Sequence, residues 1–176
     1  MYRILLFFLI TLKASISFSQ GYDVYGIGIY DVKFDGSNTQ EATDFRYERR
    51  FDNSLIDIGP KEDNFFYLKP LIGVEYTSDN ASYFLAGVYI EENLNEIFGS
   101  EKNLFNFIPS FAFGYYDDGN GKKLGNNLQF RTTFEISYNL KNENRVGISL
   151  GHISNANLGD KNPGVEIVSI TYQIPF

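Results

Sequence analysis

The sequence contains no cysteine and no tryptophan, and its 176 residues include only one histidine. Without cysteine the chain forms no disulfide, carries no thiol nucleophile and offers no thiolate ligand for zinc. A single histidine also argues against a metal centre built from several imidazoles. The composition therefore predicts a protein that works without disulfides, a bound metal or a cofactor.

Basic residues are in deficit as well. Fifteen lysines and arginines stand against 22 aspartates and glutamates, which gives a net charge of −7. Proteins that bind nucleic acid need clustered lysine and arginine to neutralise phosphates. The charge balance therefore argues against a nucleic-acid partner.

Long apolar runs are missing, apart from a short one near the start. Arg3 precedes an apolar run over 4–12, and the small residues Ser17 and Ser19 precede Gln20. This pattern predicts a signal peptide over 1–19 and a single exported domain over 20–176. No later stretch approaches the ~18 apolar residues of a membrane helix. A membrane-inserted form would have to be a closed β-barrel, in which every backbone group is paired.

Aromatic residues and glycines are abundant, with 17 Phe, 13 Tyr and 16 Gly against 5 Pro. Such a composition favours β-structure. The clearest strand is 128–140, in which apolar residues occupy nearly all even positions and polar residues the odd ones. Eight such segments are expected, separated by turn-rich sequence: 22–34, 42–51, 64–77, 81–91, 104–116, 128–140, 144–155 and 164–176.

The fold class predicted from these segments is all-β, an eight-stranded antiparallel transmembrane barrel of the outer-membrane type. The last strand alternates apolar residues and ends on Phe176, which resembles the C-terminal signature of bacterial outer-membrane barrels. That resemblance places the protein in the outer membrane of a Gram-negative bacterium and makes Phe176 the contact for the barrel-assembly machinery. A soluble β-sandwich and a lipocalin-like carrier are the alternatives. Arg46, Arg49 and Arg50 would meet anionic lipid head groups or join an internal ion-pair lattice with Asp44 and Glu48.

The only histidine belongs to the strongest candidate site. His152 and Ser154 are two residues apart on a predicted strand, so their side chains share a face. The Asn-Pro-Gly segment 162–164 reverses the chain and brings Glu166 alongside, and a hairpin centred near residue 160 would set Ser154 opposite Glu166. A base beside a hydroxyl, with a carboxylate to orient the base, is the arrangement of an activated serine nucleophile.

The face and the end of the barrel can also be predicted. His152, Ser154 and Glu166 lie on the apolar faces of their strands, which look toward lipid in a transmembrane barrel. If both termini are periplasmic, the connection between the last two strands lies at the cell exterior, in the outer leaflet. The alternative interpretation is a set of interfacial polar residues at a strand end, without catalytic function.

The motif His-x-Ser-Asn-Ala at 152–156, then Asn-Pro-Gly-x-Glu at 162–166 and a Phe-terminated strand, resembles the lipid A 3-O-deacylase (PagL-like) or acyloxyacyl hydrolase family. The resemblance covers about 25 C-terminal residues. It implies an outer-membrane carboxylic ester hydrolase whose catalytic residues would be Ser154, His152 and Glu166. Asn155 would contribute to the oxyanion hole. Asn157 would assist there or contact substrate, although the family pattern has a small residue near this position.

The resulting hypothesis is a serine esterase that removes the 3-O-linked acyl chain of lipid A and so remodels lipopolysaccharide. Its partners would be lipid A and the outer membrane, with a homodimer as a further possibility. The competing hypothesis is a small non-catalytic barrel that serves adhesion, surface stability or lipopolysaccharide binding.

Overall fold

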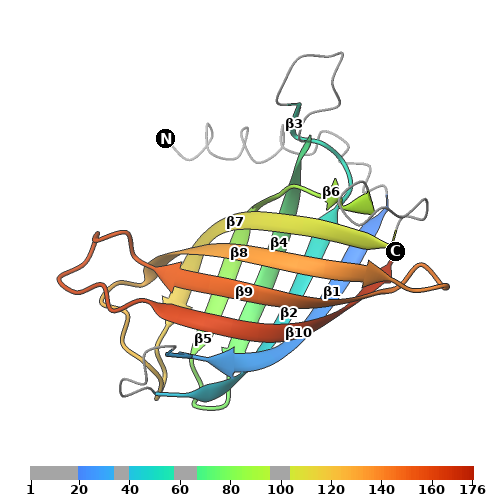
Figure 1. Cartoon of the computed structure of the whole chain (residues 1–176). Coiled ribbons are helices and arrows are strands. Elements are labelled where there is room, and N and C mark those ends of the chain that lie inside the picture. Colours follow the sequence, from blue (N-terminus) through green and yellow to red (C-terminus); the bar gives the residue numbers. More distant parts are fainter. Residues whose placement is uncertain (1–19, 34–39, 58–66, 96–103) are drawn as a thin grey trace, which may run out of the picture.

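The computed structural model describes residues 20–33, 40–57, 67–95 and 104–176. Eight long strands form the wall of a single barrel (Figure 1). They are β1 (Gly21–Tyr30), β2 (Ala42–Phe51), β4 (Tyr67–Thr77), β5 (Ser82–Tyr89), β7 (Phe105–Asp117), β8 (Leu128–Asn139), β9 (Arg145–Ser154) and β10 (Val165–Pro175). Two short strands, β3 (Ile56–Asp57) and β6 (Glu92–Asn93), extend the sheet beside β4 and β7.

The sheet closes on itself through antiparallel pairs. The first and last strands are neighbours, with Tyr25 opposite Tyr172. On its other edge β1 pairs with β2. Strand β2 in turn pairs directly with β4, which is the next long strand along the chain. The remaining long strands follow in chain order. Closure leaves no open edge in the wall, which is the condition for a sheet to cross a membrane.

The outer face of the wall is apolar. Ile148 on β9 is 66% exposed and Ile170 on β10 is 65% exposed, and neighbouring strands present Phe84, Phe111 and Phe134 in the same way. In water such a belt would be an aggregation hazard, whereas in a bilayer it is the surface that contacts lipid. The predicted two-faced strands are therefore confirmed. Because the apolar faces look outward, the arrangement is the reverse of the one a lipocalin-like carrier needs.

The inner face combines charged and polar residues with a cluster of buried apolar ones. Arg50 and Arg131 are almost completely buried, and each contacts two glutamates. Smaller residues leave room for the long side chains of this network. At Gly73, for example, a Cβ atom would stand 3.0 Å from Cγ of Glu48, which pairs with both arginines.

The predicted strands agree with the structure to within a few residues where they can be compared. The segment 42–51, whose charges made it the least regular of the eight, is β2 with its predicted bounds. Parts of the predicted segments 22–34 and 64–77, and the predicted signal peptide 1–19, lie outside the described residues. Within the described residues, no helix is long and apolar enough to cross a membrane.

Candidate active site

The candidate site lies on the hairpin made by β9 and β10. In that hairpin Glu166 stands directly opposite His152, and Val165 stands opposite Ile153. The sequence-based expectation that Ser154 faces Glu166 is therefore wrong by two residues, because the hairpin is centred near residue 159 and not 160. A shift of two leaves every side chain on its predicted face. His152 is exposed on the outer face, in line with Leu150 and Ile148.

The imidazole of His152 and the carboxylate of Glu166 are in hydrogen-bond contact. Nδ1 of His152 lies 3.2 Å from Oε1 of Glu166. A carboxylate only accepts hydrogen bonds, so this contact places a hydrogen on Nδ1 and leaves the Nε2 lone pair for a proton. The histidine side chain is 50% exposed and that of the glutamate 32%. The pair is therefore open to a molecule that approaches along the barrel wall.

The lack of a side chain at Gly164 makes room for the edge of the imidazole that carries Cε1 and Nε2. Its φ of 57° is in the left-handed region that favours glycine. A Cβ at this position would stand 3.0 Å from Cε1 of His152 and 3.6 Å from Nε2. The ring thus leans over Gly164, toward the end of the hairpin. The hydrogen-bonded turn of this loop lies at 155–158 and not at the predicted Asn-Pro-Gly segment, whose glycine instead makes space for the histidine.

Ser154 is the last residue of β9 and is half-buried. Ser154 comes directly after Ile153, and Gly164 comes directly before Val165. The serine and the glycine therefore lie just beyond the Ile153–Val165 pair, which is the pair of the hairpin nearest its loop. The imidazole that leans over Gly164 therefore leans toward the strand end that carries Ser154. A second hydroxyl also neighbours the histidine, since Thr132 on β8 stands opposite His152 from the other side.

The structure places Asn155 behind the site. Its side chain is buried, and Nδ2 donates to the carbonyl oxygens of Leu124 at 2.8 Å and Lys161 at 2.6 Å. Its backbone N–H donates to Oδ1 of Asn162 at 3.0 Å. These bonds connect the β7–β8 loop with the β9–β10 loop. The donors of Asn155 are thus engaged within the protein, and its predicted contribution to an oxyanion hole stays a prediction.

Asn157 lies in the exposed turn that follows. Ala156 and Asn157 both have positive φ, at 52° and 62°, and the N–H of Leu158 donates to the carbonyl of Asn155 at 2.9 Å. Two consecutive positive φ values are those of a type I′ turn, in which asparagine and glycine are favoured. The side-chain oxygen of Asn157 accepts from Nδ2 of Asn162 at 3.2 Å. The two asparagines therefore hold the turn in place.

Sequence reasoning missed Lys33. This residue follows β1, whose last pairs with β10 include Tyr30 opposite Ile167. The N–H of Val32 extends the pairing by donating to the carbonyl of Glu166 at 2.9 Å. As a result, Nζ of Lys33 reaches Oε2 of Glu166 at 3.5 Å. The sequence does show a lysine close after the first strand, but its contact with Glu166 follows only from the closure of the barrel.

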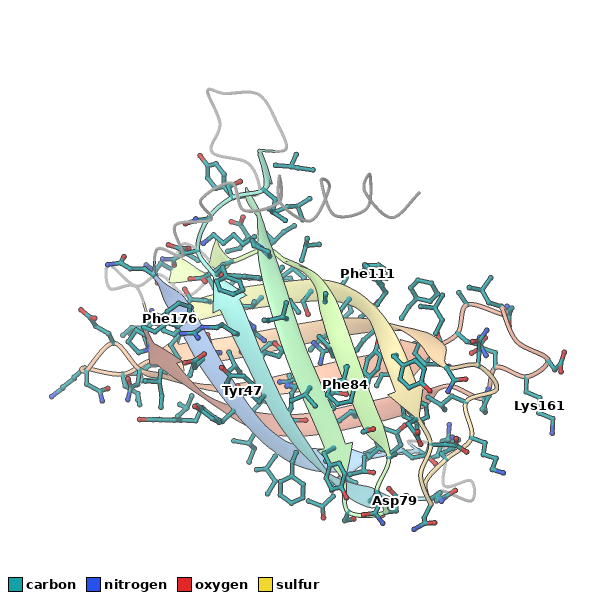
Figure 2. All side chains as sticks on the ribbon, turned by 180° about the vertical axis from the view of Figure 1, so that it is seen from behind. Tyr47, Asp79, Phe84, Phe111, Lys161 and Phe176 are labelled. Atoms are coloured by element: carbon teal, nitrogen blue, oxygen red, sulfur yellow. The ribbon has the colours of Figure 1, made fainter. Side chains whose placement is uncertain are left out.

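An apolar groove runs along the outer wall below the His–Glu pair. It has a volume of about 750 Å³ and is formed by side chains of β7, β8, β9 and β10. The residues nearest the site include Leu150 and Phe134, and the far end includes Phe105 and Tyr138. Figure 2 shows Lys161, in the loop above the site, at the opposite end of the barrel from Phe176. The groove thus leads from the site toward the end that holds the C-terminus.

A closed antiparallel barrel with an apolar outer belt and a charged lumen defines the class of this protein as an outer-membrane β-barrel. Within that class the chain belongs to the lipid A 3-O-deacylase (PagL) family, whose model matches residues 25–175. The family suggested by the C-terminal motif is therefore confirmed over almost the whole described barrel.

Individual proteins resemble the chain to different extents. The lipid A deacylase PagL of Bordetella bronchiseptica is 36% identical over 55 residues, a stretch that spans 31% of this chain and 31% of that protein. The crystal structure of the outer membrane enzyme PagL matches with a TM-score of 0.65 at 17% identity, over 89% of this chain and 100% of that one. A de novo designed transmembrane β-barrel matches with a TM-score of 0.52 at 9% identity, over 87% and 93% of the two chains.

Proposed function

We propose that this protein is a serine esterase of the outer membrane that hydrolyses the 3-O-linked acyl chain of lipid A. The observation that carries the proposal is the 3.2 Å contact between His152 and Glu166 on the lipid-facing side, at the strand end that holds Ser154. A polar pair on such a face costs free energy in a bilayer, so its presence needs a compensating function. The family and the groove below the pair favour an acyl substrate.

The proposed reaction has two steps. Ser154 Oγ attacks the ester carbonyl carbon while Nε2 of His152 takes the hydroxyl proton. The sugar oxygen then leaves with that proton, and an acyl-serine remains. Water, deprotonated by His152, attacks the acyl-serine and releases the fatty acid with Ser154 restored. Glu166 holds the hydrogen on Nδ1 throughout and stabilises the imidazolium that forms in each step.

The position on the outer wall suits an amphipathic substrate. A lipid that stays in the leaflet can place its acyl chain in the groove along β7 to β10 and its ester near His152. If the termini are periplasmic, this rim lies in the outer leaflet, where lipid A is found. Phe176, whose N–H donates to the carbonyl of Gly21 at 3.1 Å, would then present the C-terminal signal to the assembly machinery from the periplasmic side.

The test compares lipid A from cells that express the native chain, Ser154→Ala or Thr132→Val. Mass spectrometry should detect loss of a 3-O-linked acyl chain with the native protein and with Thr132→Val, but not with Ser154→Ala. Thr132→Val is the matched control, because it removes the other hydroxyl beside His152. Outer-membrane fractionation and a heat-modifiable band would establish that each variant is a folded barrel.

Two results would contradict the proposal. Deacylation by Ser154→Ala together with its loss in Thr132→Val would show that the nucleophile is Thr132 on β8 and not Ser154 on β9. Unchanged lipid A with all three folded proteins, in a strain whose lipid A carries the 3-O-linked chain, would favour the non-catalytic barrel instead.

A further inference from the structure

Glu166 has two carboxylate oxygens, and only one of them contacts the histidine. Oε1 lies 3.2 Å from Nδ1 of His152, whereas Oε2 lies 3.5 Å from Nζ of Lys33. A carboxylate at a strand end can rotate about its side-chain torsions and move Oε1 away from the imidazole. A cation on the second oxygen restrains that rotation. Lys33 therefore occupies the position from which the orientation of Glu166 can be controlled.

Lys33 is itself held from behind. Its Nζ lies 3.9 Å from Oδ1 of Asp31, a buried residue with a positive φ of 60°. Nζ of Lys122, from the β7–β8 loop, lies 2.6 Å from that same Asp31 oxygen. The N–H of Gln40 donates to the other Asp31 oxygen at 2.9 Å. The carboxylate of Asp31 is thus fixed by three groups, and it gives the Lys33 ammonium a fixed partner.

These contacts form a line of alternating charge that ends at the imidazole: Lys122, Asp31, Lys33, Glu166 and His152. It joins the connection after β1 and the β7–β8 loop to the β9–β10 hairpin. Only the last two members lie on the hairpin that carries the candidate catalytic residues. The remaining three come from chain segments far away in sequence.

We infer that Lys33 is a positioning residue of this site, which holds Oε2 of Glu166 so that Oε1 stays aligned with Nδ1 of His152. The inference rests on the proposed function. Lys33 acts through the glutamate and need not touch the substrate.

The test uses the full-length protein in detergent micelles with an uncharged short-chain nitrophenyl ester as substrate. We expect Lys33→Met to lower kcat about two- to fivefold, the range that corresponds to a partly exposed ion pair. KM should stay unchanged, because Lys33 acts on Glu166 and does not contact the substrate. Lys33→Arg should restore kcat, since it keeps the charge and the donor. High salt should lower the native kcat toward that of Lys33→Met.

Lys69→Met is the matched control. Lys69 on β4 forms an ion pair with Asp52, which follows β2, away from the site. Its side chain is buried to a degree similar to that of Lys33. Lys69→Met should leave kcat and KM unchanged.

Three results would overturn the inference. One is a Lys33→Met protein with native kcat, and another is a loss of kcat that Lys33→Arg does not restore. The third is a defect seen with lipid A but not with the uncharged ester, which would make Lys33 a contact for an anionic head group. If Ser154→Ala is inactive in the same assay, these results reject the role of Lys33 alone. Full activity of Ser154→Ala would reject the proposed function itself.

Discussion

The charged group in the lumen of this barrel differs from the one on its rim. In the lumen, Arg50 contacts both oxygens of Glu135, at 3.3 and 3.1 Å, and its Nε contacts Glu48 at 3.0 Å. Arg131 joins Glu48 to Glu75. All five side chains are almost fully buried. The rim pair of His152 and Glu166 has one contact between its members, and a third to a half of each side chain is exposed.

The difference shows how burial divides similar chemical groups between structure and reactivity. Charges removed from water need partners, and burial in the lumen keeps these groups out of reach of a substrate in the leaflet. A pair on the rim keeps one imidazole nitrogen for chemistry, because Glu166 occupies only the other. The lumen therefore supports the wall, and the rim is where a reaction can occur.

The largest effect is expected in the lumen. Arg131→Met leaves Glu48 and Glu75 buried without their shared cation, and breaking a buried pair in this way costs about 3–5 kcal/mol. Urea unfolding of the refolded barrel should measure the loss, while the activity of each folded molecule stays near native. A variant with native stability but reduced activity would break the comparison, because it would couple the lumen to the site.

A change on the rim should reduce activity and leave stability nearly unchanged. Glu166→Gln keeps the shape but removes the charge that supports the imidazolium, so turnover should slow about 100-fold, or roughly 2.7 kcal/mol. The loss is set below that of a buried catalytic carboxylate because water can partly replace this exposed one. Unfolding in urea should be within about 0.5 kcal/mol of native. A large loss of stability would make Glu166 a structural residue like those in the lumen.

Asn155 lies between the two cases, since it is buried but belongs to the rim loops. Asn155→Ala leaves the carbonyls of Leu124 and Lys161 without their donor and should cost about 1–3 kcal/mol of stability. The same variant sharpens the comparison through its kinetics. If turnover slows by about 100-fold or more at native stability, the oxyanion role is favoured over the structural one. A loss of stability with a modest kinetic change is expected from the contacts described.

The fold was predictable because apolar and polar residues alternate along most strands, so that each kind occupies one face. Leu128 to Asn139 needed no tertiary information, since lipid selects one face and the packed lumen the other. Strand β2 was harder to predict. Arg46 and Arg50 face inward to carboxylates, whereas Arg49 faces outward to Asp23 at 3.4 Å and to the ring of Phe176 at 3.9 Å. The internal lattice was one of the two expected outcomes, but only the closed barrel assigns each arginine to a face.

The site was predictable only within its own hairpin. His152 and Glu166 could be placed on one face from local spacing alone, although the turn geometry moved the pairing by two residues. The contact of Asn155 with Leu124 joins residues 31 apart in sequence, and that of Glu166 with Lys33 joins residues 133 apart. The first depends on how neighbouring loops pack and the second on barrel closure, and neither is present in any single motif.

The seam between β1 and β10 has a consequence for how the molecule acquires activity. Glu166 belongs to the final strand made by the ribosome, and Lys33 follows the first, so the two meet only when the cylinder shuts. An unsealed intermediate could therefore contain every residue of the site and still lack its assembled geometry. On the proposed function, turnover would then be about two- to fivefold lower in the precursor and would reach its full value only on completed insertion.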